Sequence, residues 1–435
     1  MYTYLISEII SWISGTIAFI VFLEHFLQRK PVREFFKRKW VWIPLVVKII
    51  STYSGLIFNR TNSPDFAMPL FMHSMAPGGI APTLPLINIL TFFKNESNFE
   101  RVVDIGRDPN DVPQAITRTS STEVKINVIV KEVISEVGPG IYFNYWTFNG
   151  TVPGPMYRAR EGDTIILSIT NDPTSLHHHN IDLHAVTGQG GGASLTDVMP
   201  GETKTIKWKA LNQGLFIYHC AMPNVSTHNS HGQYGLILVE PKEGLPKVDK
   251  EFYIVQGELY TRGQLGKKGL TVFDSKALLD GLPNYVTFNG RIESTPRMHA
   301  KVGETVRMYV GNGGVNLISS FHVIGEVFDT VYPEGSLGEG GAKLKNVQTT
   351  AVLPGGSTIV EFKVDVPGKF LLVDHALSRM NKGAWAVLEV SGDKQPDIYS
   401  QVSNDYKINS TSTDISQKEI IPSKEINIMS KMEGH

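Results

Sequence analysis

Cysteine is almost absent from this chain of 435 residues, which contains only Cys220. A single cysteine excludes an internal disulfide framework, and its position excludes a lipid-anchoring cysteine near the N-terminus. Net charge is nearly absent as well, because 41 basic residues face 42 acidic ones. A chain this neutral has no electrostatic field for gathering nucleic acid, so no nucleic-acid partner is expected.

Glycine and proline, by contrast, are plentiful, with 40 and 24 copies, which favours turn-rich β structure over long helices. The chain is also too long for one ordinary core, so two domains are expected. An internal repeat supports this division. FNGTVPGP at 148–155 resembles FNGRIEST at 288–295, and REGDTIILSITN at 160–171 resembles KVGETVRMYVGN at 301–312.

The last part of the repeat pairs residues 199–221 with 353–376. Each copy contains short alternating stretches such as TIILSIT and TVRMYV, which are typical of strands in a sandwich. We therefore predict an all-β fold with one sandwich over 121–243 and a second over 244–392. A short helix is predicted only at 275–282.

The first 58 residues differ from the rest. The apolar stretch at 4–23 is about one membrane span long, although Glu8 interrupts it. A basic segment follows at 24–39, and then a second apolar stretch at 40–58 that contains a proline and a lysine. Since the positive charge comes after the first apolar run, an uncleaved membrane anchor is favoured over a secretory signal.

Two spanning segments would form a hairpin over 1–58, with the basic loop in the cytoplasm and the rest of the chain outside, in the periplasm or its equivalent. If the second segment only lies in the interface, the rest would face the cytoplasm. A third reading is two buried helices of a soluble domain. Residues 59–120 are interpreted as a linker and lead-in, and the polar residues 393–435 as an extended tail.

A lone cysteine is usually a small buried hydrophobe, but Cys220 has unusual neighbours. His219 precedes it directly, and His228 follows in STHNSHGQYG. Residues two apart on a strand share a face, whereas adjacent residues oppose each other. Parity then sorts the neighbouring polar residues into two sets. They are His179, Cys220 and His228 in one set, and Asp182, His184 and His219 in the other.

One thiolate with two imidazoles is the donor set of an electron-transfer copper site. The other set needs a third imidazole, and His375 in LLVDHALSR of the second repeat is the candidate. Three neutral imidazoles with an open position make a catalytic metal site. The peptide link between His219 and Cys220 would suit electron transfer between the sites. Taken singly, each histidine could equally be an ordinary surface or core residue.

The stretches HNIDLHAVTGQGGG, LFIYHCA, SSFHVIGEVFD and LLVDHALSRMNKGA closely resemble the copper-containing nitrite reductases of denitrification. The resemblance runs from about residue 121 to 392. It implies two tandem cupredoxin-like Greek-key β-sandwiches and a homotrimer. It also implies one-electron reduction of nitrite to nitric oxide, with electrons from a donor protein or a membrane quinol.

Position by position, the resemblance implies two coppers per chain. His179, Cys220 and His228 would hold the type 1 copper, and His184, His219 and His375 the type 2 copper. His375 would come from the neighbouring subunit of the trimer. The remaining matches are Asp182 and His322 as proton donors, Ile324 as the apolar limit on how nitrite sits, and Thr350 as the support of His322, with Thr349 adjacent.

One position departs from the family. The family has an axial methionine five residues after the second type 1 histidine, where this chain has Gln233. Met222 and His231 are the alternative axial donors, and a three-coordinate copper is the remaining possibility.

Two other functions stay open. A multicopper oxidase shares the fold, but it needs paired His-X-His motifs, and this chain has HCA where such enzymes have HCH. A membrane-bound copper electron carrier with an idle second site is the other. Copper content per chain would separate the three.

Overall fold

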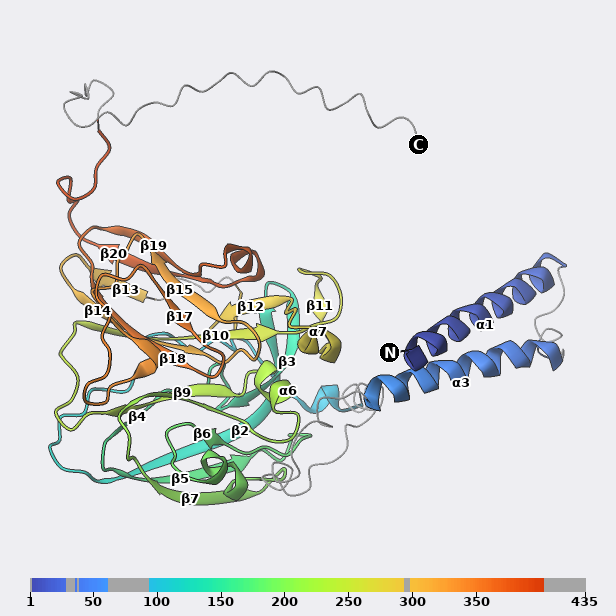
Figure 1. The fold of residues 1–435 in the computed structure, drawn as a ribbon, viewed down its shortest axis with the longest axis horizontal. Coiled ribbons are helices and arrows are strands. Elements are labelled where there is room, and N and C mark those ends of the chain that lie inside the picture. Colours follow the sequence, from blue (N-terminus) through green and yellow to red (C-terminus); the bar gives the residue numbers. More distant parts are fainter. Residues whose placement is uncertain (1, 29–35, 37–38, 62–93, 293–297, 403–435) are drawn as a thin grey trace. The chain divides into compact units, whose positions relative to one another are not determined.

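The computed structural model describes residues 2–28, 36, 39–61, 94–292 and 298–402 (Figure 1). The chain begins with two long helices, α1 (Tyr2–Leu27) and α3 (Lys39–Thr61). The two helices pack side by side. Between them, Ser11 Oγ lies 3.0 Å from Thr52 Oγ1, and Lys48 Nζ lies 3.4 Å from the carbonyl oxygen of Ser11. The lysine therefore meets polar atoms of the opposite helix.

The two helices differ in their capacity to cross a membrane. In α1, the segment Ile10–Leu27 is long and apolar enough to span, whereas the apolar part of α3 is the shorter Val41–Thr52. The predicted helical region at the N-terminus is confirmed. Whether one or both helices span stays a prediction.

The first sandwich consists of two sheets. One has the strand order β11-β3-β2-β5-β7, with β1 paired to β2, and the other has the order β4-β9-β8-β6. Their bounds are Glu100–Val102 (β1), Glu123–Gly138 (β2), Ile141–Phe148 (β3), Tyr157–Arg160 (β4), Thr164–Asn171 (β5), Asp182–Leu183 (β6), Thr203–Lys209 (β7), Gly214–His219 (β8), Tyr234–Glu240 (β9) and Gly269–Leu270 (β11).

The second sandwich repeats this plan. Its sheets have the orders β12-β10-β14-β18-β16 and β13-β20-β19-β15-β17. Their bounds are Lys250–Leu259 (β10), Tyr285–Phe288 (β12), Met298–Lys301 (β13), Thr305–Asn312 (β14), Ser319–Ile324 (β15), Thr330–Tyr332 (β16), Thr349–Val352 (β17), Ser357–Lys363 (β18), Gly368–Asp374 (β19) and Trp385–Ser391 (β20). The order β3-β2-β5-β7 corresponds to β12-β10-β14-β18, so the sequence repeat is a structural repeat.

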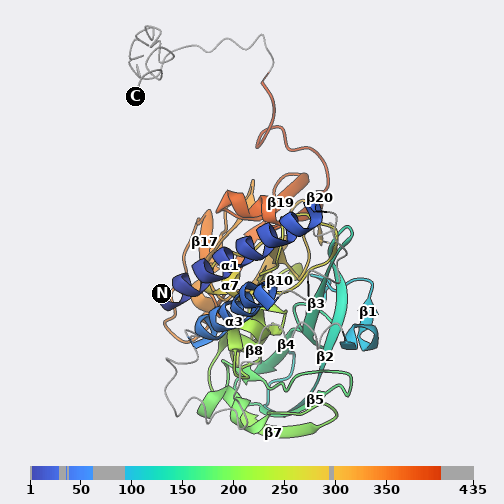
Figure 2. The same cartoon turned by 90° about the vertical axis from the view of Figure 1, so that its right-hand side faces the viewer.

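Burial follows the alternation of the sequence. In β5, buried positions alternate with half-buried ones along the whole strand, because one face meets the core. Each sandwich encloses its own apolar core, and a third cluster joins β8 and β9 of the first sandwich to β10 and β14 of the second. Strand β9 lies between these cores and is buried at every position. Figure 2 shows β7 and β20 at opposite ends of this stack.

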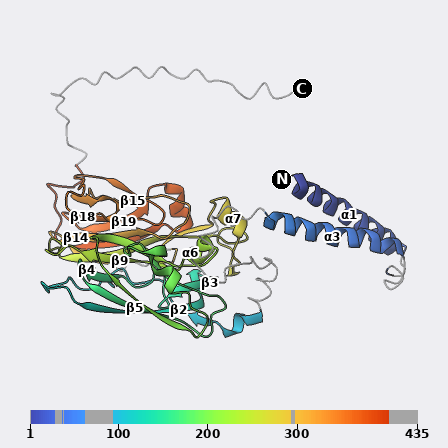
Figure 3. The same cartoon turned by 60° about the horizontal axis from the view of Figure 1, so that its bottom comes forward.

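Short helices complete the described part of the chain. Helix α7 (Ser275–Leu279) falls within the predicted helix and is capped by Asp274, whose side chain accepts from the backbone N–H groups of Lys276 and Ala277. Helix α6 (Val225–Ser230) packs near α7 (Figure 3). The 3-10 helices are Glu96–Asn98 (η2), Gln189–Leu195 (η3), Pro333–Gly335 (η4) and Leu377–Lys382 (η5).

The predicted lead-in is more regular than expected. Helix α3 continues to Thr61, and β1 pairs in parallel with β2. Residues 62–93 of this segment and 403–435 of the predicted tail lie outside the described residues. The chain separates into one compact unit that ends at Asp393 and a second that begins at Lys394. The predicted domain boundaries within the first unit stay a prediction.

Candidate metal centres

The end of one strand brings both donor sets together. Strand β8 ends at His219, so Cys220 is the first residue beyond it. The neighbouring strand β6 runs antiparallel and places Asp182 directly opposite His219. Because adjacent residues on a strand point to opposite faces, His219 and Cys220 serve separate sites.

The first donor set is fully enclosed. The Nδ1 atoms of His179 and His228 lie 4.0 Å and 3.4 Å from Cys220 Sγ. All three ligand atoms lie within 4.8 Å of one another, and all three residues are buried. His228 is carried by α6, which follows the loop after β8.

Gln233 points its amide oxygen at this set. Its Oε1 lies 3.1 Å from His228 Nδ1, and its side chain is fully buried. Its Nε2 has no hydrogen-bond partner in the described part of the chain. By contrast, the Nδ1 of His231 donates to the Thr227 carbonyl at 2.7 Å, and Met222 lies in the apolar core of the sandwich.

The electrostatics of the first set suit a bound cation. Burial raises the pKa of the Cys220 thiol to about 12. Burial also lowers the pKa of His179 and holds that of His228 well below its ordinary value, so both rings are neutral and offer lone pairs. A metal ion supplies the positive charge that the buried thiolate lacks. One thiolate with neutral imidazoles therefore fits copper.

Two residues that the sequence did not single out hold this set in place. Asn180 Oδ1 accepts from the Ala221 N–H at 2.7 Å and lies 3.6 Å from Cys220 Sγ. Glu132 on β2 lies 3.4 Å from His179 Nε2. Asn180 directly follows the proposed ligand His179 in the sequence, so sequence reasoning could have found it. Glu132 comes from a strand much earlier in the chain, and nothing in the sequence marks it.

The second donor set is more open. His184 Nε2 lies 3.1 Å from His219 Nε2. The same His219 nitrogen lies 3.9 Å from Asp182 Oδ2. His219 Nδ1 donates to the Cys220 carbonyl at 2.9 Å, which leaves the Nε2 lone pair free for a metal. Burial, and then the adjacent His219, lowers the pKa of His184. Facing imidazole nitrogens beside a carboxylate fit a metal ion.

A glycine loop covers Asp182. Gly191 in η3 has a φ of 56°, and a Cβ added there would lie 1.8 Å from Asp182 Oδ1. Only a glycine can pack this closely against the carboxylate with this backbone conformation. The GQGGG segment therefore fixes Asp182 on the face that His184 and His219 share.

His322 and His375 lie together in the second sandwich. Their ring centroids are 5.5 Å apart, and His322 Nδ1 donates to the Gln348 carbonyl at 2.5 Å. Among the described residues, neither belongs to a group of three metal ligands within one chain. Ile324 ends β15 two residues beyond His322, on the same face, and is 41% exposed.

The placement of Thr350 differs from the prediction. The register of β15 and β17 sets Thr349 opposite His322, and Thr350 opposite the buried Phe321. Cross-strand partners share a face, so Thr349 is the neighbour of His322, and Thr350 is buried behind it. The prediction was one residue out, because two adjacent threonines cannot be told apart without the register.

The strand argument behind the two donor sets was also only partly right. Strand β6 is just Asp182–Leu183, and His179 forms an isolated bridge with Val198 instead. The chain between them is irregular. The structure nevertheless brings together both sets, with His179 beside Cys220 and Asp182 beside His219.

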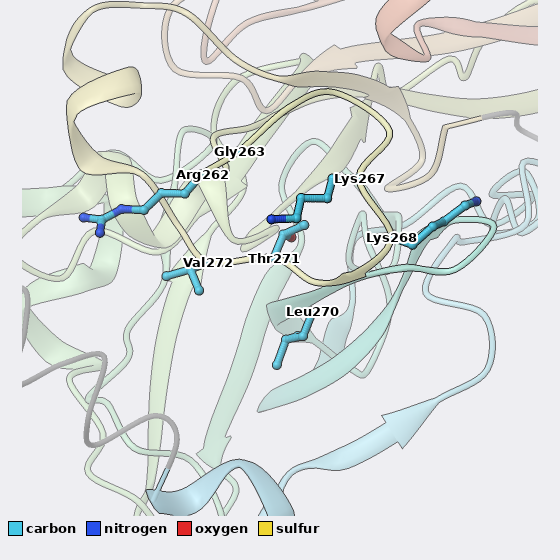
Figure 4. Close-up of a pocket in the computed structure, with 7 residues that line it drawn as sticks. All are labelled: Arg262, Gly263, Lys267, Lys268, Leu270, Thr271 and Val272. Atoms are coloured by element: carbon cyan, nitrogen blue, oxygen red, sulfur yellow. The ribbon is translucent and has the colours of Figure 1, made fainter.

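An open depression of about 400 Å³ lies elsewhere, in the loop after β10. It is lined by Arg262, Gly263, Lys267, Lys268, Leu270, Thr271 and Val272. Figure 4 shows Arg262 and Lys268 pointing away from each other. The cationic groups do not converge, so this depression is not a built anion site.

The chain is similar to several known copper proteins. A multicopper oxidase family model matches residues 135–244. A copper-containing nitrite reductase from Neisseria gonorrhoeae is 53% identical over 299 residues, which cover 68% of this chain and 75% of that protein. One from Cereibacter sphaeroides is 32% identical over 301 residues, 64% of this chain and 79% of that protein.

A solved copper nitrite reductase from Nitrosomonas europaea superposes with a TM-score of 0.55 at 30% identity, covering 63% of this chain and 96% of that one. Its likeness confirms that the two sandwiches are cupredoxin-like. The extent and identity of the Neisseria match show the family. This chain belongs to the copper-containing nitrite reductases, enzymes that reduce nitrite with copper.

Proposed function

We propose that this chain reduces nitrite to nitric oxide, with a type 1 copper and a type 2 copper in the two donor sets. His179, Cys220, His228 and axial Gln233 would hold the type 1 copper. His184 and His219, with His375, would hold the type 2 copper. Bound there, copper would supply electron transfer at the first site and nitrite binding with one-electron reduction at the second.

The observation that carries this proposal is the junction at the end of β8. His219 Nε2 faces His184 at 3.1 Å, whereas the adjacent Cys220 Sγ faces His228 Nδ1 at 3.4 Å. A single peptide link therefore connects a buried, closed donor set to an open one. A closed site excludes water and substrate, and an open site admits nitrite.

Proton delivery is assigned to Asp182 and His322. Nitrite plus one electron and two protons gives nitric oxide and water, so the site needs proton donors near the departing oxygen. Gly191 holds the carboxylate of Asp182 beside His219. Since His322 donates its Nδ1–H to the Gln348 carbonyl, its Nε2 is the nitrogen that can exchange a proton with the substrate.

The open set needs a partner chain. His184 and His219 provide two imidazoles, and His375 lies with His322 in the other sandwich. We assign His375, His322 and Ile324 to the type 2 site of a neighbouring copy in a homotrimer. Each copy would then give one face of a site to each neighbour. The predicted sandwiches at 121–243 and 244–392 are the halves that meet there.

Membrane attachment is assigned to residues 1–58. Ile10–Leu27 is long and apolar enough to cross a membrane. The basic residues after it favour an uncleaved anchor, with the enzyme outside the cytoplasm, in a periplasm or its equivalent. A membrane quinol or a donor protein would supply the electron.

The alternatives fit the residues less well. Multicopper oxidases share the fold, and the family model carries their name. Reduction of oxygen needs a cluster built from paired His-X-His motifs, whereas HCA at 219–221 has alanine at the second histidine position. An electron carrier would not need Asp182 beside the second set or His322 beside His375.

The test is anaerobic turnover of nitrite by the copper-loaded full-length protein, with nitric oxide detected directly. Stoichiometric nitric oxide and two coppers per chain are expected. Ammonia as the product, or oxygen consumption without nitric oxide formation, would overturn the proposal.

A further inference from the structure

Glu132 is a buried carboxylate that the proposed reaction does not use. It lies on β2 with no exposed surface. Its Oε1 accepts from the backbone N–H groups of Leu176 and His177, at 2.8 Å and 2.9 Å, and from His177 Nδ1 at 3.0 Å. Its Oε2 has no partner in the described part of the chain. Because a carboxylate loses its hydration when it is buried, the position of Glu132 calls for a role.

The carboxylate lies directly behind a proposed copper ligand. His179 turns Nδ1 toward Cys220 Sγ at 4.0 Å and Nε2 toward Glu132 Oε1 at 3.4 Å. An ionised carboxylate only accepts hydrogen bonds, so it holds the ring proton on Nε2. The Nδ1 lone pair is thereby directed at the thiol. Ligating histidines commonly donate their other N–H in this way.

The surroundings of Glu132 screen its negative charge only weakly. The Trp146 ring packs against His177 with centroids 4.2 Å apart and meets His228 edge-on at 4.7 Å. Trp146 is 6% exposed, so water has little access. In the described part of the chain, the imidazoles of His177 and His179 lie next to the Glu132 carboxylate, and no Lys or Arg forms an ion pair with it. A charge in such a site is weakly screened.

We propose that Glu132 is a positioning residue of the type 1 site, which orients His179 and lowers the copper potential. The inference rests on the proposed type 1 centre. A negative charge behind the ligand favours Cu(II), which carries one more positive charge than Cu(I). The residue thus acts in the same direction as the axial amide of Gln233.

Two substitutions separate orientation from charge. Glu132→Gln keeps an oxygen for His179 but removes the charge. The preference for Cu(I) over Cu(II) is expected to rise about tenfold, which is about 59 mV in a redox titration of the full-length holoenzyme. The thiolate-to-copper absorption should remain. Glu132→Leu removes charge and acceptor together, and copper affinity is expected to fall about 10- to 100-fold.

Glu136→Gln is the matched control. It removes the same charge from the same strand, where the Glu136 carboxylate accepts from the Gly140 N–H at 2.9 Å. Potential and copper affinity should stay at their wild-type values. If Glu132→Gln has the wild-type potential, or if the control shifts it equally, the inference is wrong. If Glu132→Leu does not fold, the Glu132→Gln titration still decides.

Failure of the proposed function can be told apart from failure of the role of Glu132. Wild-type protein without a thiolate-to-copper band would remove the type 1 assignment itself. Wild-type protein with that band and unchanged Glu132 variants would overturn only the role of Glu132.

Discussion

The two sandwiches share a scaffold and differ at the end of one strand. In the first, β8 ends at His219 and is followed by Cys220; in the second, β19 ends at Asp374 and is followed by His375. The buried Asn171 at the end of β5 donates to the carbonyls of His177 and Val198. Asn312, at the end of β14, donates to those of Leu317 and Val352. The same anchor thus holds the same loop in both copies.

A second shared feature is the FNG turn. Asn149 and Asn289 have φ angles of 58° and 49°. Their side-chain oxygens accept from the backbone N–H groups of Ile129 and Val255, at 3.0 Å and 2.8 Å. Asparagine tolerates the left-handed region and supplies this bond. Both shared features serve folding, so these asparagines common to the two repeats are structural.

The difference carries the chemistry. His219 turns its free nitrogen toward His184, whereas Asp374 is buried and accepts from Arg379 at 2.6 Å and from Gln256 at 3.1 Å. The second sandwich therefore uses the strand end to fix a loop, and offers His375 just beyond it. Under the proposed function, each sandwich contributes one part of a site that neither completes alone.

The largest expected effect comes from removing His375, which the second sandwich contributes to the proposed type 2 site. His375→Ala should abolish nitrite reduction and leave the thiolate-to-copper colour, because only the type 2 copper loses a ligand. Turnover and visible absorption measure the two outcomes. His299→Ala, an exposed histidine of the same sandwich, is the control and should change neither. Simultaneous loss of colour and activity would refute the two-site assignment.

The two proposed proton donors come from different sandwiches, Asp182 from the first and His322 from the second. Asp182→Asn keeps the shape of a first-sandwich donor, and His322→Ala removes its second-sandwich counterpart. Each should lower turnover by roughly 10²-fold, in line with general acid catalysis, with copper content unchanged. Steady-state rates and metal analysis provide the check. Full activity of either variant at neutral pH would remove that residue from proton delivery.

Sequence reasoning reached the parts of the molecule that rest on local pattern or rare residues. Alternation predicted the strands of both copies, and the one cysteine with its histidines marked the strand end. It could not supply what depends on register or on distant strands. Thr349 and Thr350 are distinguished only by the pairing of β15 with β17. Glu132 reaches His179 from β2, and the irregular chain around β6 has no signature of its own.

The next prediction concerns the axial ligand of the type 1 copper, for which Gln233 and Met222 are the rival donors in the first sandwich. An amide oxygen favours Cu(II) more than a thioether does, so Gln233→Met should raise the type 1 potential by on the order of 0.1 V. A shift of the visible spectrum should accompany it. Met222→Leu tests the rival donor and should leave both unchanged. An unaltered potential in Gln233→Met would show that the amide does not touch the copper.

Asn171 and Asn312 should contribute similarly to the stability of their two sandwiches. Asn171→Ala and Asn312→Ala each remove two side-chain hydrogen bonds that hold this loop, so each should lower the free energy of unfolding by about 1–3 kcal/mol. Only Asn171→Ala should disturb the copper colour, since Val198 bridges to His179. Denaturant titration and absorption spectra give the two readings. A colour change in Asn312→Ala would contradict the division between scaffold and site.

The smallest effect on chemistry is expected from removing the helices. A chain that begins near residue 94 keeps η2 and β1, including the ion pair between Glu100 and Lys131 that ties β1 to β2. Both sandwiches keep their cores, so this chain should be soluble and trimeric. It should reduce nitrite at the full-length rate with an artificial donor. Sedimentation with membranes, light scattering and turnover are the measurements. If the shortened chain still pelleted with membranes, attachment would have to come from the β-sandwiches or the tail, and the assignment of the anchor to residues 1–58 would be wrong.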